Sequence, residues 1–313
     1  MELRINMTAF NKILGIGVLL IMTIPAIAQQ DAQYTQYMYN TITINPAYAG
    51  SRGFMSFNGI YRSQWVGLEG APKTSSFSLN TPVNGNVGVG LSFSNDEIGP
   101  SIENALALDY AYTLQVARNE TKLSFGIKAG VQLLDVDFTK LLIYSPLEPQ
   151  FQTNIDNRLT PLIGLGTMLH HDKWYVGISA PNLLRTEHYE NSTLSTASEQ
   201  LHVFLTGGYV FDLNLDTKFK PAFLVRYVNG APLGLDISAN FLFFNKLTLG
   251  AAYRLDAAVS GLAAFQLSDQ IMLGYAYDAD TTGLSNYNSG SHEVFLRFEL
   301  FTRVRNRISP RFF

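Results

Sequence analysis

The chain has no cysteine among its 313 residues. This absence excludes disulfide bonds, a lipid anchor on an N-terminal cysteine, thiol catalysis and metal sites built from thiolates. The fold must therefore depend on hydrogen bonding and on the burial of apolar surface.

Charge is also scarce. Lys, Arg, Asp and Glu together make up 15% of the residues, and the formal net charge is −3. A nucleic-acid-binding protein needs a basic surface, so the composition argues against one. The hydrophobic fraction of 47% is high for an exported soluble domain, but it suits a barrel whose outer face meets hydrocarbon.

Long apolar runs are missing outside the N-terminal region, which excludes a helical inner-membrane protein. The one apolar stretch, residues 13–24, follows basic residues, is interrupted by Pro25 and precedes a small-residue cleavage site from Ala26 to Ala28. It is shorter than the roughly 20 residues of a membrane span. We therefore interpret residues 1–28 as a removable secretion signal rather than as a membrane anchor.

Alternation of apolar and polar side chains dominates the rest of the chain. In residues 87–94, for example, Val, Leu and Phe alternate with Gly and Ser, which is the period of a β-strand. Segments of roughly ten such residues are typical of a transmembrane antiparallel β-barrel. We expect about fourteen strands, near residues 53–64, 73–82, 86–95, 102–115, 121–133, 159–169, 173–180, 201–212, 217–228, 233–244, 246–255, 257–267, 270–278 and 292–303.

The lengths of the connections support a closed barrel. The three longest, near residues 135–158, 181–200 and 279–291, all follow odd-numbered strands, whereas the connections after even-numbered strands are compact. Outer-membrane barrels have short periplasmic turns and longer external loops, so this sorting predicts a periplasmic N-terminus. A soluble β-sandwich or propeller, the alternative, has no reason to sort connections in this way.

Several short motifs follow one another along the chain. They are Asn45–Gly50, Arg62–Gly67 with Gly70–Pro72, Asn95–Pro100, Leu123–Gly130, Ser179–Asn182, Tyr253–Asp256 and Gly274–Asp278. In this order they resemble the PorP/SprF family over nearly the whole chain after the signal. The order is much more specific than any single motif.

The resemblance implies a component of the bacterial outer membrane that belongs to the type IX secretion and gliding machinery of the Bacteroidetes. Members of the family are associated with the export or surface attachment of large adhesins. A SprF-like role implies a secreted partner with a type B C-terminal domain, and a PorP-like role implies contact with periplasmic ring components. The sequence leaves both roles open, and neither requires catalysis or a cofactor.

The segment of residues 29–52 is polar and rich in tyrosine, without strand alternation. Because Pro46 disfavours helix at Asn45, we expect an extended periplasmic segment that enters the barrel as a plug or binds a partner. A disordered leader is the alternative. Trp65, in the first outward loop, is either a partner anchor or an interfacial girdle residue. The candidate partner-binding residues are Tyr34, Tyr37, Tyr39, Asn45, Pro46, Tyr48, Trp65 and Pro72.

The polar positions of the strands should face the lumen. Their charges have mixed signs, which favours cross-strand ion pairs that fill the interior over a conducting pore with a selective charge ring. We interpret the glycines on this face, such as Gly88 and Gly90, as positions that relieve crowding inside a curved wall. The candidate lumen residues are Asp109, Lys128, Arg226, Asp236, Arg254, Glu293, Arg297 and Glu299.

The sequence contains only weak indications of a metal-binding or catalytic site. The five histidines lack metal-ligand spacing, so we interpret them as solvated turn or rim residues. Residues 278–283 begin like a calcium loop, but the twelfth position is Ser289 rather than Glu, so we assign no metal site and leave open a loosely held external calcium ion. No catalytic motif is present, although a lipase or acyltransferase with dispersed residues would show none.

We therefore expect a signal peptide (1–28), a periplasmic or plug segment (29–52), a barrel (53–303) and a basic C-terminal tail (304–313). The tail is either a solvated terminus or a periplasmic strip that docks on the secretion ring or on assembly machinery. A non-enzymatic barrel for secretion and adhesin attachment, in contact with outer-membrane lipid, is the leading hypothesis. An outer-membrane solute channel or lipid-handling porin is the alternative.

Overall fold

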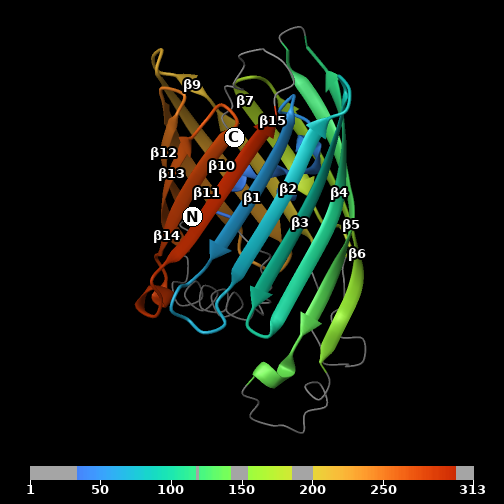
Figure 1. The fold of residues 1–313 in the computed structure, drawn as a ribbon, viewed down its shortest axis with the longest axis vertical. Coiled ribbons are helices and arrows are strands. Elements are labelled where there is room, and N and C mark those ends of the chain that lie inside the picture. Colours follow the sequence, from blue (N-terminus) through green and yellow to red (C-terminus); the bar gives the residue numbers. More distant parts are fainter. Residues whose placement is uncertain (1–33, 118–119, 142–153, 185–199, 301–313) are drawn as a thin grey trace, which may run out of the picture.

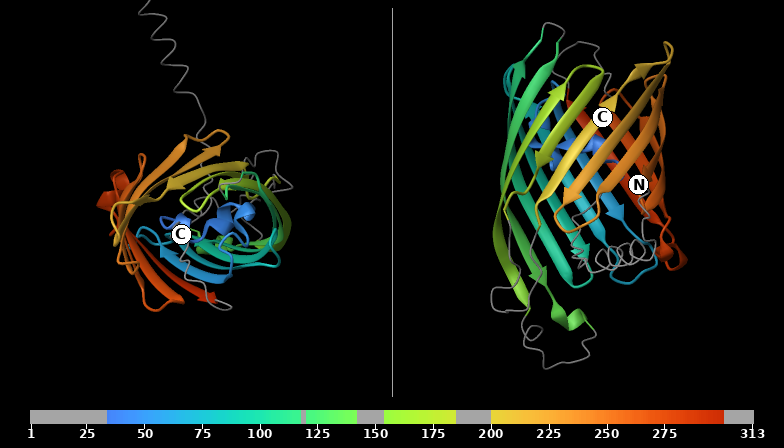
Figure 2. Two further views of the ribbon diagram at one scale, coloured as in Figure 1. Left: turned by 90° about the horizontal axis from the view of Figure 1, so that it is seen from above. Right: turned by 180° about the vertical axis from the view of Figure 1, so that it is seen from behind.

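The alternating segments form strands that close into a ring. The computed structural model describes residues 34–117, 120–141, 154–184 and 200–300. In this part of the chain neighbouring strands pair in antiparallel fashion, and the last strand pairs with the first. The result is an up-and-down barrel, seen from the side in Figure 1 and along its axis in Figure 2.

The strand positions follow the sequence expectation closely, and the largest differences are a few residues at strand ends. The strands are β1 (Met55–Ser63), β2 (Lys73–Pro82), β3 (Val87–Ile98), β4 (Ser101–Gln115), β5 (Lys122–Val136), β6 (Ile155–His170), β7 (Trp174–Ala180), β8 (His202–Tyr209), β9 (Phe211–Asp212), β10 (Thr217–Val228), β11 (Gly234–Phe243), β12 (Leu247–Arg254), β13 (Ala258–Gln266), β14 (Ile271–Asp280) and β15 (Ser291–Leu300).

The short strand β9 continues β8. Gly208 pairs with Ala222 and Phe211 pairs with Phe219, which is one unbroken register. The interruption lies opposite Pro221, which has no N–H group to donate to the ladder. Because β8 and β9 form one pass of the wall, the barrel has 14 strands, as the sequence predicted.

The two ends of the barrel differ in their connections. Those between β5 and β6, β7 and β8, and β14 and β15 are the longest, and all three lie at one end, with η3 (Phe138–Lys140) and η5 (Gly283–Asn286). We call this the long-loop end, at the bottom of Figure 1. The opposite short-turn end holds the start of β1 and the end of β15, because Met55 pairs with Leu300.

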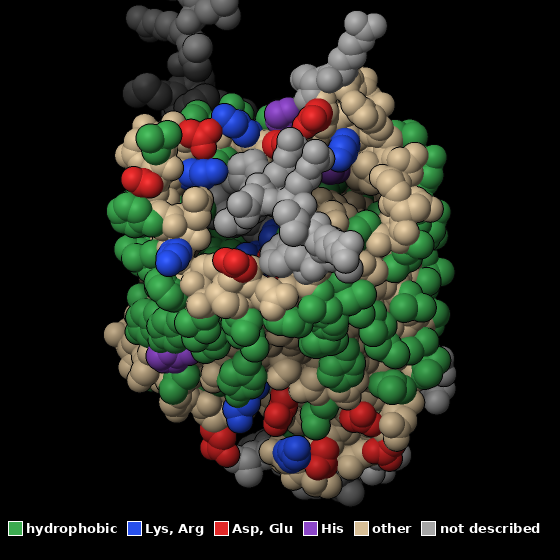
Figure 3. All heavy atoms as spheres, turned by 45° about the horizontal axis from the view of Figure 1, so that its top comes forward, with side chains coloured by type: hydrophobic (Ala, Val, Ile, Leu, Met, Phe, Trp, Pro, Cys, Tyr) green, Lys and Arg blue, Asp and Glu red, His purple; other side chains and the backbone are tan. Residues whose placement is uncertain are grey.

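The outer face of the wall is apolar. Leu108, in the middle of β4, is 62% exposed, whereas its neighbour Asp109 is 3% exposed and points inward. Exposed aliphatic and aromatic side chains continue in this way around the barrel and form the band seen in Figure 3. Such a face is stable only in contact with hydrocarbon or with another apolar surface. Within the described residues, no helix is both long and apolar enough to cross a bilayer.

The described part of the N-terminal segment, residues 34–52, lies inside the barrel, as Figure 2 shows. This part, which we call the plug, contains η1 (Tyr37–Tyr39), α2 (Thr41–Ile44) and η2 (Pro46–Tyr48). The expectation of an extended segment was therefore wrong. Short helical turns pair backbone groups that a single extended strand would leave without partners in the lumen.

The end of α2 agrees with the sequence. Asn45 has an extended backbone, with φ −135° and ψ 108°, as the following Pro46 requires. The Asn45 side chain then accepts a hydrogen bond of 2.9 Å from the N–H of Ala47 and begins η2.

Several inward glycines make room for the plug. A Cβ atom on Gly126 would lie 2.1 Å from the backbone nitrogen of Ala47, and one on Gly88 would lie 2.1 Å from the carbonyl oxygen of Ala49. A Cβ atom on Gly90 would likewise meet a plug side chain. For these three glycines our interpretation is corrected, because their close neighbour is the plug. It holds for Gly130, where a Cβ atom would meet Leu106 and Ala107 of the neighbouring strand.

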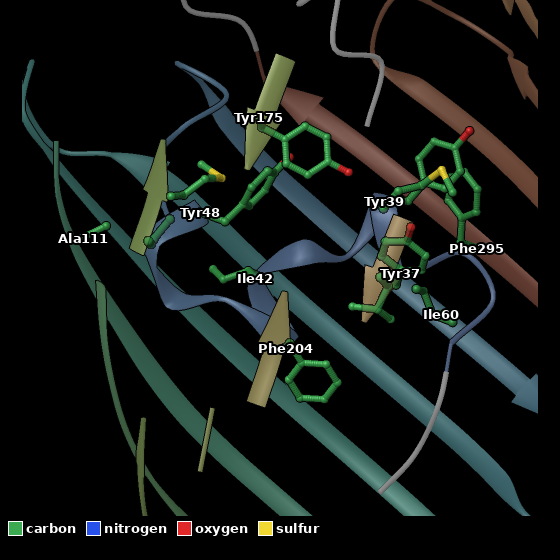
Figure 4. Packing of buried hydrophobic residues seen from close by; sticks show 14 of the residues in the cluster. Tyr37, Tyr39, Ile42, Tyr48, Ile60, Ala111, Tyr175, Phe204 and Phe295 are labelled. Atoms are coloured by element: carbon green, nitrogen blue, oxygen red, sulfur yellow. The ribbon is translucent and has the colours of Figure 1, made fainter. Parts of the chain in front are cut away.

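The apolar core of the molecule lies between the plug and the wall. Met38 and Ile42 are each 1% exposed, and both pack against inward side chains. The rings of Tyr39 and Phe295 stack with their centroids 4.2 Å apart. Figure 4 shows this packing, in which plug side chains meet residues of several strands.

Candidate functional site: the plug and the barrel interior

A buried ionic cluster holds the beginning of the plug. The guanidinium of Arg62, on β1, lies 2.7 Å from a carboxylate oxygen of Asp278 and 3.1 Å from one of Glu293. The hydroxyl of Thr35, in the plug, donates to Asp278 and accepts from Arg62. The three charged side chains are almost completely buried.

Glu293 also binds the plug backbone. Its two carboxylate oxygens accept the N–H groups of Thr35 at 2.9 Å and of Gln36 at 2.8 Å. Hydrogen bonds to a buried charged acceptor are the stronger kind. Breaking a buried pair by removing one partner typically costs about 3–5 kcal/mol, because the other charge remains buried.

The middle of the plug is held by amide side chains. Asn40 donates to the hydroxyl of Ser76 at 3.1 Å and accepts from Ser78 at 2.6 Å, both on β2. Asn45 donates to the carbonyl of Thr167 on β6 at 3.1 Å. The plug is therefore attached to two parts of the wall that are separated by three strands.

A second ionic cluster lies near the end of the plug. Arg52 is 2.6 Å from Glu299, and Arg297 is 3.2 Å from the same carboxylate. The guanidinium of Arg297 also lies 5.7 Å from the centre of the Tyr39 ring, within the range of a cation–π contact.

Two further ion pairs join neighbouring strands in register. Lys128 is 2.8 Å from Asp109, its partner across β4 and β5. Arg254 is 2.7 Å from Asp236, its partner across β11 and β12.

All eight candidate lumen residues thus lie on the inner side of the wall. Arg226, the remaining one, is half-buried and lies over Gly234 on the neighbouring strand. Sequence reasoning did not select Arg62 or Asp278 for the lumen, although both occupy inward positions of their strands. It also missed Thr35, Gln36 and Asn40, because nothing in the sequence says which wall residues face them.

The candidate partner-binding tyrosines pack inside the barrel. Tyr37, Tyr39 and Tyr48 are buried, as are Asn45 and Pro46, while Tyr34 is half-buried. Burial raises the pKa of Tyr37 and of Tyr39 above the ordinary value. These hydroxyls therefore remain neutral, and a partner could reach these side chains only if the plug left the lumen.

Hydrogen bonds to the connection between β14 and β15 hold the connection between β1 and β2 in place. Trp65 is half-buried, has φ +46° and donates its N–H to the hydroxyl of Ser291 at 3.1 Å. The backbone of Val66 exchanges hydrogen bonds with Gly290 and Ser289, at 2.9 and 2.7 Å. Within the same turn, the carbonyl of the buried Pro72 accepts from Gln64, at 2.9 Å.

Two of our chemical interpretations need correction. Asp278 is bound to Arg62 inside the barrel, so it is not available to an external calcium loop. His170 and His202 are 3% and 5% exposed, because both project inward from the wall, and are not solvated rim residues. His188 and the basic tail lie outside the described residues, as does the signal. Among the described residues, no group of three or more His, Cys, Asp or Glu side chains could hold a metal ion.

Little space remains around the beginning of the plug. A hollow of about 10 Å³ lies between Thr35, Tyr37 and the wall near Arg254. This volume is close to the minimum that a single water molecule requires. Around Thr35 and Tyr37 the barrel is therefore filled.

Comparison with known proteins identifies the family. The family model described as "Type IX secretion system membrane protein PorP/SprF" matches residues 26–298. The chain belongs to this family. With the barrel fold, this membership makes the protein an outer-membrane component of type IX secretion rather than a known enzyme.

Solved structures with a similar outline are outer-membrane barrels. The outer membrane protein Omp33 of Acinetobacter baumannii is 8% identical, with a TM-score of 0.48 over 79% of this chain and 99% of that one. OmpF of Salmonella typhi, in complex with daunomycin, is 10% identical, with a TM-score of 0.39 over 79% and 97% of the chains. Likenesses this distant carry no information about function. No curated protein matches this sequence.

The motifs of this PorP/SprF barrel meet in space. Asn45–Gly50 packs against Gly126, which belongs to the motif Leu123–Gly130. Arg62 and Asp278, from motifs at opposite ends of the barrel sequence, form one ion pair. The motifs that carry the family resemblance therefore include both sides of the contact between plug and wall.

Proposed function

We propose that this PorP/SprF barrel binds a large secreted adhesin with a type B C-terminal domain and helps to export it or attach it to the cell surface. The barrel acts as a binding component and performs no catalysis. The observation that carries the proposal is the plug, which occupies the lumen and is fixed to the wall by buried ionic and hydrogen-bonded contacts. Family membership supplies the secretion context.

The filled lumen favours binding over solute conduction. An open porin keeps a water-filled channel, and its polar lining faces solvent. Here Glu293, Lys128 and Arg297 are between 0% and 5% exposed, and each forms an ion pair within the protein. A solute path through this interior would require the plug to leave.

We place the adhesin contact at the long-loop end. The turn around Trp65 offers a half-buried indole, and Val66 beside it is 37% exposed. Hydrogen bonds to residues 289–291 hold this turn in place, so a partner would not need to order it. Rigid aromatic anchors are typical of residues that dominate binding energy. The plug tyrosines would contribute only in a state with the plug released, and periplasmic ring components would meet the short-turn end.

Affinity purification from native membranes in mild detergent tests the proposal. We expect an adhesin with a type B C-terminal domain to be retained by the wild-type chain and its recovery to fall at least tenfold with Trp65→Ala. The matched control is Trp174→Ala, which changes the only other tryptophan at the opposite end of the barrel. A purified wild-type barrel that conducts steadily in a planar bilayer, and retains no secreted protein, would contradict the proposal and favour a solute channel.

A further inference from the structure

A groove of about 980 Å³ with an almost entirely apolar lining crosses the wall between β7 and β13. Strands β8 and β10, in yellow, cross this part of the wall and face the viewer in the right-hand view of Figure 2. One side of the groove includes Pro221 and Ala239, which lie opposite each other on β10 and β11. The other side is the row two residues further along each strand, with Phe223, Ile237 and Tyr253.

The groove opens to the outside of the barrel. None of the described plug residues lines it. Ala222 and Ser238, which lie between its two sides, are buried and point inward, so the floor consists of strand backbone that pairs across the sheet. Ile237 and Tyr253 point outward and are 47% and 40% exposed. The groove therefore belongs to the outer face of the wall.

The dimensions of the groove suit one acyl chain. From β7 to β12 it crosses five neighbouring strands, which at about 4.8 Å between strands corresponds to about 19 Å. Its two sides stand two residues apart along each strand, which is about 6.6 Å. An α-helix with its side chains is about 10–12 Å wide, so a transmembrane helix of a partner does not fit between them. The hydrocarbon core of a bilayer is about 30 Å thick, so the acyl chains of one leaflet reach about 15 Å.

One end of the groove lies at the short-turn end of the barrel. Trp174, the first residue of β7, lines this end. Its ring stacks on His171 of the preceding turn, with the centroids 6.4 Å apart. Val259, at the other end of the groove, is the second residue of β13, which begins at the long-loop end. Tryptophan is enriched where a membrane meets water, so the Trp174 end marks the level of the lipid headgroups.

The groove is continuous with the apolar outer band of a barrel that lies in the outer membrane. Its volume falls at the upper end of the range of about 300–1,000 Å³ that is usual for small-molecule sites. We propose that this groove is a binding site for one acyl chain of a phospholipid, whose headgroup lies beside Trp174. Short turns face the periplasm in outer-membrane barrels, so the lipid belongs to the periplasmic leaflet. The site involves neither the plug nor the Trp65 turn, and it is independent of the adhesin.

Filling the groove with side chains tests the proposal. The variant Ala239→Phe with Ala251→Phe places two rings on one side of the groove. The matched control is Ala263→Phe with Ala279→Phe, because both alanines are exposed on the outer face and neither lines the groove. Each full barrel is purified in mild detergent and mixed with phosphatidylethanolamine, and bound lipid is counted by native mass spectrometry. Heat-dependent electrophoretic mobility establishes that each variant is folded.

We expect the wild type and the control to retain one phosphatidylethanolamine molecule per barrel, and the filled variant to retain at least tenfold less. Equal retention by all three proteins would overturn the site. A wild type that binds no lipid and has the mass of two chains would show that a second copy covers this face. Lipopolysaccharide that displaces phosphatidylethanolamine from the wild type at equal concentration would overturn the assignment to a phospholipid.

A second measurement leaves the groove intact. The sequence has two tryptophans, so Trp65→Phe leaves Trp174 as the only one. Phosphatidylethanolamine with brominated acyl chains should lower the fluorescence of this variant about twofold in the same detergent. The control is Trp174→Phe, in which Trp65 reports from a loop and should keep its fluorescence. Absence of quenching at Trp174, or equal quenching at both positions, would contradict the proposal, whatever the result of adhesin capture.

Discussion

Glu293 on β15 lies opposite Arg62 on β1, and its carboxylate binds both the guanidinium of Arg62 and two backbone N–H groups of the plug. One side chain therefore takes part in closing the wall of the barrel and in holding its contents. The strands β1 and β15 are the first and last of the barrel, so this contact forms where the ring closes. Closure of the wall and docking of the plug are coupled through one carboxylate.

Replacement of Glu293 should affect both features. Glu293→Gln keeps the shape of the side chain but leaves Arg62 with a single carboxylate partner and weakens the hold on the plug. We expect the free energy of unfolding in detergent to fall by about 3–5 kcal/mol, as measured by urea titration. Glu69→Gln, at an exposed loop position, is the matched control and should change the stability by less than about 0.5 kcal/mol. Equal effects of the two substitutions would show that the Glu293 contacts contribute little.

The pair of Lys128 and Asp109 offers a test of how buried charges are balanced. Lys128→Met leaves the Asp109 carboxylate, 3% exposed, without its ion-pair partner. We expect this single substitution to cost about 3–5 kcal/mol, and Lys128→Met with Asp109→Leu to cost clearly less than the sum of the two single changes. Unfolding titrations of the four members of the cycle give the coupling free energy. Additive effects would mean that the two side chains do not interact energetically.

Much of the wall was predictable because alternation is a local property. Leu108 and Asp109 are neighbours in the sequence, and their opposite burial follows from the strand period alone. The same parity placed Lys128 and Arg254 in the lumen. Their exact partners follow from the strand register, which the alternation of one strand does not specify.

The plug was not predictable in the same way. Residues 34–52 have no alternation and form turns of three or four residues, too short for a helical period to be visible in the sequence. Thr35 and Asn40 gain their roles only from wall residues distant in the sequence. The glycines illustrate the same limit, since the need for Gly126 becomes clear only when Ala47 is placed beside it.

Enlarging Gly126 should displace the plug. Any side chain at this position meets the backbone of Pro46 and Ala47, and backbone cannot move aside as a flexible side chain can. We expect Gly126→Val to shift the plug and to raise the conductance of the barrel in planar bilayers at least tenfold over the wild type. Gly261→Val is the control, because a Cβ atom there meets nothing within 4 Å. Unchanged conductance with a correctly folded Gly126→Val barrel would show that the plug tolerates the added volume.

The apolar outward face of the wall allows a test of how the barrel sits in the membrane. Leu108 is 62% exposed in the middle of β4, level with Ala129 on the neighbouring strand. If this face meets acyl chains, Leu108→Arg places a charge in hydrocarbon and should reduce the stability in lipid vesicles by about 2–4 kcal/mol. Leu215→Arg is the control, since Leu215 lies in a short turn and is 98% exposed. There the charge reaches water, so the cost should stay below about 1 kcal/mol. Equal costs at the two positions would mean that the apolar band of the barrel does not lie at the centre of the bilayer.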